Sequence, residues 1–187
     1  EEPRFATLAA KARFEDLSVA AQPARPGAPD ASPTPGFERL SGIVQLDRGA
    51  GSLQLTSRDA ALVLPGVLRE PRVPLSQLAA DLRWKSGSMA ELKIAQLVLS
   101  NADLELSASG TWRAPATGSS GPGTADLSAR IARLDVRNAH RYVPTSAGEG
   151  TLSWLQHALL DGQLTEGSVR VRGDLARFPF TTPADGE

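Results

Sequence analysis

The chain has 187 residues, close to the size of one domain. It contains no cysteine and only two histidines, which excludes disulfide scaffolds and thiolate metal sites and leaves few groups for ordinary catalysis. The net charge of −1 excludes a general basic field that would attract nucleic acid.

Alternation of apolar and polar residues recurs along the chain and predicts strands. The runs, in chain order, lie at 6–14, 40–46, 53–55, 62–64, 78–84, 92–99, 101–113, 125–131 and 169–175. The clearest is 101–113, NADLELSASGTWR, in which Leu104 and Leu106 share one parity and Glu105 the other. Short turn signals separate several runs, for example DRGAG at 47–51. This pattern predicts an antiparallel meander with one apolar and one polar face.

Two stretches interrupt the meander. Residues 22–36 contain five prolines and no large apolar side chain, which predicts a flexible proline-rich loop. Residues 151–161 place Leu152, Trp154 and Leu155 on one side at helical spacing, which predicts an amphipathic helix that Gly162 ends. A shorter helix is expected from Arg137 to Tyr142. Both helices are expected to cover an open end of the sheet.

The search for a catalytic or metal site finds little. His140 and His157 lack a second histidine at metal-ligand spacing, and GSSGPG at 118–123 lacks the Lys-Ser/Thr ending of a phosphate loop. We therefore expect no metal, no cofactor and no enzymatic activity. The arginines at 130, 133, 137, 170 and 172 fit either a phosphate-binding rim or the polar face of ordinary strands.

The apolar face allows two interpretations. It is either the core of a closed β-sandwich that serves as a structural or interaction module, or the groove of a curled, incompletely closed sheet that binds an apolar ligand. Glycines inside strands, Gly42, Gly110 and Gly173, are consistent with a sheet that curls. The composition suits either interpretation, and taken alone it favours the sandwich.

Four segments of the chain resemble a known family. They are RDAALVLPGVLREP at 58–71, LSNADLELSASGTWRAP at 99–115, RYVP at 141–144 and WLQHALLDGQLTEGSVRVRGDLARFPF at 154–180. In this order they resemble segments of the YhdP family of AsmA-like proteins, bridge-like lipid-transfer proteins of the Gram-negative envelope.

The resemblance implies a mainly β fold, in which a highly curved antiparallel sheet forms an open groove with one or two short α-helices. It also implies a long protein with an inner-membrane anchor outside this segment. Residues 1–187 would form a single internal periplasmic segment, joined to adjacent groove segments of the same chain. The implied function, which contributes to outer-membrane homeostasis, is transport of phospholipids between the inner and outer membranes. No nucleic acid partner is implied.

On this reading, residues of matching parity form a lipid-binding groove. They are Leu53, Leu55, Leu62, Leu64, Leu82, Leu92, Ile94, Leu104, Leu106, Leu127, Ile131, Val169 and Val171. Trp84 and Trp112 are expected at the wall or the end of the groove. A single bulge would reverse the face of every residue beyond it.

Overall fold

The computed structural model describes residues 9–22, 33–87, 90–115, 121–177, 180 and 186. Strands dominate this part of the chain: β1 (Ala9–Val19), β2 (Gly36–Asp47), β3 (Ala50–Val63), β4 (Arg72–Lys85), β5 (Glu91–Ser100), β6 (Leu104–Arg113), β7 (Thr124–Asp135), β8 (Gln163–Leu164) and β9 (Gly167–Asp174). The helical elements are the 3₁₀ helices η1 (Val136–Tyr142), η2 (Thr145–Ala147) and η3 (Leu175–Arg177), and the α-helix α1 (Glu149–Ala158).

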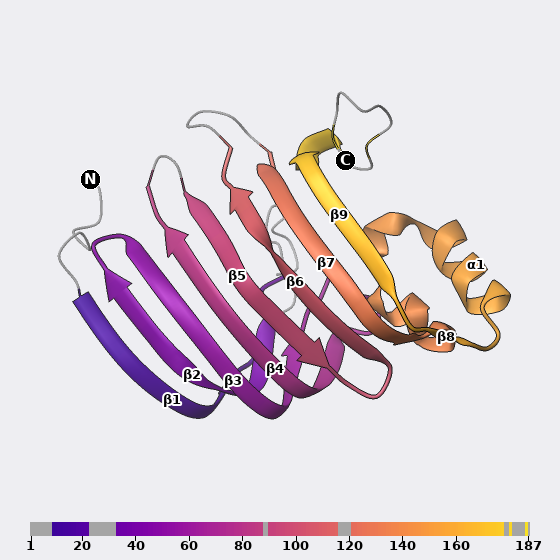
Figure 1. Ribbon diagram of the computed structural model, residues 1–187, viewed down its shortest axis with the longest axis horizontal. Coiled ribbons are helices and arrows are strands. Elements are labelled where there is room, and N and C mark those ends of the chain that lie inside the picture. The colour runs from indigo at the N-terminus through magenta and orange to yellow at the C-terminus, as the bar shows by residue number, and fades with distance from the viewer. Residues whose placement is uncertain are drawn as a thin grey trace.

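The strands form one antiparallel sheet in chain order from β1 to β7. β8 and β9 then both pair with β7, at different parts of its length. β1 and β8/β9 lie at opposite edges and do not pair among the described residues, so the sheet stays open (Figure 1). The predicted curved antiparallel meander is thus confirmed, and the described residues form a single sheet rather than a closed sandwich.

Some predicted boundaries differ from the observed ones. β6 begins at Leu104 rather than at residue 101, because Asn101 to Asp103 form a turn. Most of the predicted proline-rich loop falls outside the described residues, but Gln22 and Thr34 near its ends pair in a short bridge, with N···O distances of 3.0 and 2.9 Å.

A sharp bend crosses the first three strands. Asp16 on β1, Arg39 on β2 and Asp59 on β3 have left-handed backbones, with φ of 49°, 54° and 50°. The pairing register also shifts around Asp16 and Arg39, as expected for β-bulges. Each of these strands therefore bends sharply partway along its length, and the sheet forms a trough (Figure 1).

Serine hydroxyls bond to backbone groups at the bend. Ser41 Oγ accepts from the backbone N–H of Asp16 at 3.0 Å, and Ser18 Oγ accepts from that of Arg39 at 3.0 Å. Ser57, only 3% exposed, accepts from the N–H of Ser41 at 2.9 Å and donates to its carbonyl at 3.3 Å. The bend is thus built without leaving these amides unpaired.

The two faces of the sheet differ in chemistry. On the inner face a buried cluster fills the bend: Leu40, Leu55, Ala60, Leu75, Leu78 and Ala80. The outer face carries the alternate residues of each strand, such as Lys93, Thr111, Asp126 and Arg172, which oppose one another across β5, β6, β7 and β9. One face is apolar and the other polar, as the alternation predicts.

Close backbone approach explains two strand glycines. A Cβ at Gly42 would lie 2.2 Å from the carbonyl oxygen of Gln54, and one at Gly110, where φ is +146°, would lie 2.1 Å from that of Asp126. Any side chain would force neighbouring strands apart, so these glycines permit the tight curvature.

The helices cover the far end of the sheet, beyond β7. α1 packs on η1 and η2 through Leu152, which is 2% exposed. It begins two residues before the predicted 151–161 and ends at Ala158, so Gly162 does not cap it. Trp154, which the helical spacing groups with Leu152, is 61% exposed. η1 replaces the predicted short helix and is a 3₁₀ rather than an α-helix.

Candidate functional site: the inner face of the trough

The structure places twelve of the thirteen predicted groove residues on strands and one in a loop. Strand register brings most of them into rows on the inner face, because directly opposed residues point to the same side. One row contains Leu53, Leu82, Ile94, Leu127 and Val171. In another, Leu106 lies opposite Ile131, and Leu104 follows on the same face of β6.

Leu62 and Leu64 show the effect of the bend. Leu62 has the opposite parity to Leu53 and Leu55, yet it packs on the same buried cluster. The left-handed Asp59 lies between them and reverses the face. Leu64 lies beyond the end of β3, in the loop to β4, so it does not belong to the rows.

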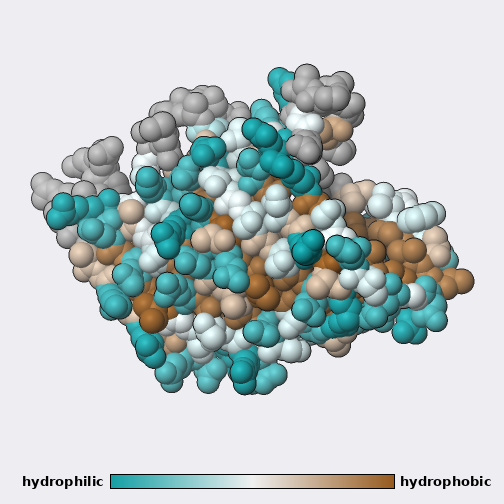
Figure 2. All heavy atoms as spheres, viewed as in Figure 1, coloured by the Kyte–Doolittle hydropathy of each residue, from teal (hydrophilic) through white to brown (hydrophobic). Residues whose placement is uncertain are grey.

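Side chains of the protein fill the trough at β2–β4 and leave it more open at β5, β6, β7 and β9. In the bend of β2–β4, Leu75 is 2% and Leu78 3% exposed. On β5, β6, β7 and β9 most inner-face residues are only partly buried: Leu104 and Ala125 are buried, whereas Val169 is 50% exposed. Figure 2 shows hydrophobic side chains gathered across the lower middle of the molecule and into its helical end, between hydrophilic ones. Within the described part of the chain, no helix and no second sheet packs across this partly exposed apolar face.

A row of large side chains marks one end of the open side. Trp84, Leu92 and Trp112 oppose one another across β4, β5 and β6. The indole of Trp84 lies over Gly51, where a Cβ would come within 2.3 Å of the ring. Trp112 Nε1 donates to the carbonyl of Pro122 at 2.8 Å. Both tryptophans therefore lie in one row on the inner face, near the ends of their strands.

Arginines on the outer face bond to nearby acceptors. Arg170 and Arg172 lie 3.6 and 3.7 Å from the carboxylate of Asp126. Arg137 bonds to Asp135 at 3.3 Å, and its guanidinium holds the pKa of that carboxyl below its usual range. Arg130 lies 3.6 Å from Glu166. This arrangement favours the polar strand face over a phosphate-binding rim.

Sequence reasoning missed a polar network at the opposite end of the strands. Asn101, 8% exposed, donates through Nδ2 to the carbonyl of Pro74 and to Tyr142 Oη, both at 3.0 Å, and accepts from the amides of Asp103 and Leu104 at 2.9 and 2.8 Å. Burial and the nearby Asp103 carboxylate raise the pKa of Tyr142. The Asn-Ala-Asp sequence, typical of a side-chain-capped turn, was a usable signal for Asn101.

Cations join this network to the helices. Arg133 donates to the carbonyls of Asn101 and Ala102, both at 2.6 Å. Arg141 lies 3.1 Å from Asp103 and 3.3 Å from Glu70, which links η1 to the loop between β3 and β4.

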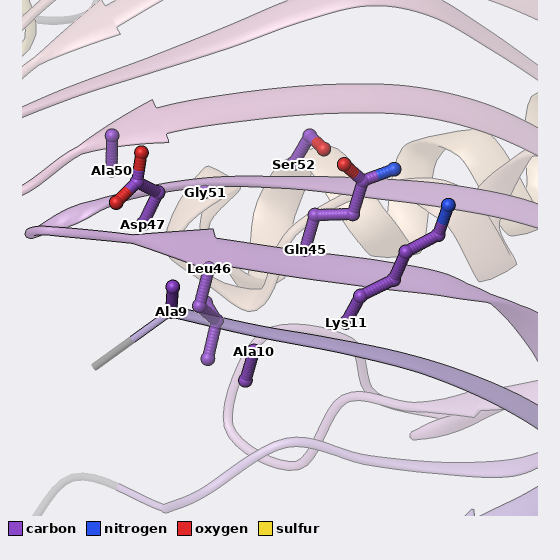
Figure 3. Close-up of a pocket in the computed structure, with 9 residues that line it drawn as sticks. All are labelled: Ala9, Ala10, Lys11, Gln45, Leu46, Asp47, Ala50, Gly51 and Ser52. Carbon is purple, nitrogen blue, oxygen red and sulfur yellow. The ribbon is translucent and has the colours of Figure 1, made fainter.

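Depressions elsewhere on the sheet are shallow. One of about 480 Å³ lies at the β1 edge and the turn between β2 and β3. In Figure 3 Lys11, Gln45 and Ser52 point to one side of the strands and Ala10 to the other. Residues of both faces line it, so it is a corner of the sheet rather than an enclosed site.

Each histidine ring forms a hydrogen bond with a backbone carbonyl of its own helix. His140 Nδ1 lies 3.0 Å from the carbonyl of Arg137, and His157 Nδ1 lies 2.7 Å from that of Ser153. Across the described part of the chain, no three His, Cys, Asp or Glu side chains gather as a metal site. No helix in the same part has the length and apolarity to cross a membrane.

An open, strongly bent sheet with an apolar inner face and a charged outer face defines a β-groove protein. Comparison with protein families gives a match to the YhdP protein model over residues 2–186. The chain therefore belongs to the YhdP family, a family of AsmA-like envelope proteins. Searches of curated proteins and of solved structures found no match.

Proposed function

We propose that the inner face of this chain binds phospholipid acyl chains, as one periplasmic segment of a lipid conduit between the inner and outer membranes. The observation that carries the proposal is the incomplete cover of the inner face over β5, β6, β7 and β9, where Leu127, Ile131 and Val171 stay partly exposed. Family membership supports the same role.

The energetics favour a mobile ligand. Burial of each methylene contributes about 0.8 kcal/mol, so a long acyl chain gains on the order of 10 kcal/mol on entering the trough. This attraction has no preferred direction. Rows of aliphatic side chains therefore hold a chain without fixing its position, and transport of this kind needs no catalytic residue.

The free edges of the sheet fit a segment within a longer groove. β1 and β9 lie at edges of the sheet, and among the described residues the outer side of β9 has one bridge partner, Gly186, which pairs with Gly173. Such edges pair readily with further strands. We propose that adjacent segments of the full-length protein pair there and continue the trough toward each membrane, with the inner-membrane anchor elsewhere in that protein.

Lipid retention tests the proposal. The chain is purified gently and bound phospholipid is quantified by native mass spectrometry. We expect phospholipid on the unmodified chain and a large loss in Leu106→Asp, because a carboxylate in the trough opposes acyl-chain burial. Leu106 suits this test better than Leu104, which is only 8% exposed.

Ser107→Asp is the matched control, because Ser107 is the next residue of β6 and lies on the outer face opposite Arg130. This variant is expected to keep its lipid. A folded Leu106→Asp chain that retains as much phospholipid as Ser107→Asp would contradict the proposal. A chain that purifies without lipid would favour a spacer module instead.

A further inference from the structure

The two rims of the trough are built differently. At the rim formed by the loop 64–71 and the turn 101–103, named here the helical rim, the helices are fastened to the sheet. Thr145 N–H donates to the carbonyl of Val67 at 2.9 Å, Leu68 pairs with Pro144, and Arg69 bonds to Glu149 on α1.

Polar groups at the helical rim bond mainly to the protein itself. Asn101 makes four hydrogen bonds, and Arg133 and Arg141 bond to two carbonyls and two carboxylates respectively. A lipid headgroup at this rim would have to displace these contacts, and the helical segment lies over the same end (Figure 1).

At the opposite rim, named here the tryptophan rim, Trp84, Leu92 and Trp112 form the last inner-face row on β4, β5 and β6. The next row, at the ends of the strands, has the parity of the outer face and carries charge, with Lys85 opposite Glu91 and Glu91 opposite Arg113. Arg113 bonds to Glu91 at 2.8 Å, and its side chain stays 62% exposed.

The order of side chains along the strands, from aliphatic through indole to charged, matches the boundary between the hydrocarbon and the headgroup of a phospholipid. Indoles favour such a boundary because one end of the ring system is apolar and the other donates a hydrogen bond. Exposed cations next to the indoles bind phosphate oxygens by charge-assisted hydrogen bonds.

We infer that phospholipids lie in the trough with their phosphate at the tryptophan rim and their acyl chains directed along the strands toward the helical rim. This inference rests on the proposed function and adds the orientation of the ligand. From Trp112 to Leu104 the inner face of β6 spans eight residues, about 26 Å at ~3.3 Å per residue. One leaflet of a bilayer core is about 15 Å thick, so an acyl chain fits within this length.

Tryptophan fluorescence tests the orientation. The chain has three tryptophans, and Trp84→Phe with Trp154→Phe leaves Trp112 alone. The purified chain is loaded with phosphatidylcholine brominated either near the ester group or near the terminal methyl. We expect the ester-proximal bromine to remove more Trp112 fluorescence than the terminal one.

A second tryptophan, placed closer to the helical rim, reports on the other end of the lipid. Leu106→Trp, with all three native tryptophans replaced by Phe, places an indole on the same face of β6, six residues from Trp112 and about 20 Å away. There the terminal bromine is expected to quench more strongly. If this variant does not fold, Ile131→Trp replaces it, because Ile131 lies directly opposite Leu106.

The outcomes separate two failures. Bound phospholipid with equal quenching at both reporters, or with the order reversed, overturns the orientation and leaves lipid binding intact. A chain that retains no phospholipid after loading, as measured by its phosphate content, overturns the proposed function and the orientation with it.

Discussion

At the scale of single residues, the helical rim depends on the buried Asn101 and the partly buried Tyr142 and Asp103. Tyr142 is the only tyrosine of the chain, and it bonds to Asn101 and Asp103 at 3.2 Å. Burial first, and the Asp103 carboxylate next, raise the pKa of its phenol. The fold therefore favours the neutral phenol, whose ordinary pKa is about 10.

We expect the ultraviolet absorbance of tyrosinate to appear at higher pH in the folded chain than in the urea-unfolded chain. The pKa of Tyr142 is higher in the folded chain than in the unfolded chain. The contribution of this phenol to stability is therefore complete below about pH 10 and is lost as pH rises through the folded pKa. The free energy of unfolding should fall over that range. The Tyr142→Phe variant is the control, and its free energy of unfolding should not show this part of the decrease with pH. A folded midpoint at or below the unfolded one would contradict the burial of this group.

At the scale of elements, alternation was sufficient to predict the strands. Period-two patterns are local, so the sequence identifies most strands and places Leu104 and Leu106 on one face. It does not locate the bend, because the left-handed Asp59 reverses parity without a distinctive signal. Nor does it show that Asn101 meets Tyr142, 41 residues further along the chain, since that contact depends on the curved sheet.

The bend itself gives a prediction. Ser57→Ala removes the acceptor of the Ser41 amide inside the bend, and we expect it to lower the free energy of unfolding by about 1–3 kcal/mol. Ser52→Ala, on the outer face of the same strand, is the control and should change it little. Urea denaturation measures both. Equal small effects would mean that solvent satisfies the Ser41 amide and that the hydroxyl does not stabilise the bend.

At the scale of the whole molecule, the trough joins a self-filled half to an open half. The bend at β1–β3 closes the apolar side chains of β2–β4 on one another. β5, β6, β7 and β9 continue as an apolar surface that no other described element faces. Under the proposed function, one part of the sheet stabilises the fold and the other part binds the lipid. A groove that binds a ligand needs both parts, since a sheet that is open throughout lacks a core and a filled one has no room for a ligand.

This division predicts an uneven response to the same substitution. Leu75→Ala, in the filled half at 2% exposure, should lower the free energy of unfolding by about 2–5 kcal/mol, because it leaves a cavity among packed side chains. Leu127→Ala, on the partly exposed inner face of β7, should cost only about 1 kcal/mol in delipidated protein, because few protein atoms lie over it. The same variant should weaken phospholipid retention, which Leu75→Ala leaves unchanged in the folded fraction. If Leu127→Ala proves as costly as Leu75→Ala without lipid present, the open half is covered in solution, and the trough has no free surface on which to carry an acyl chain.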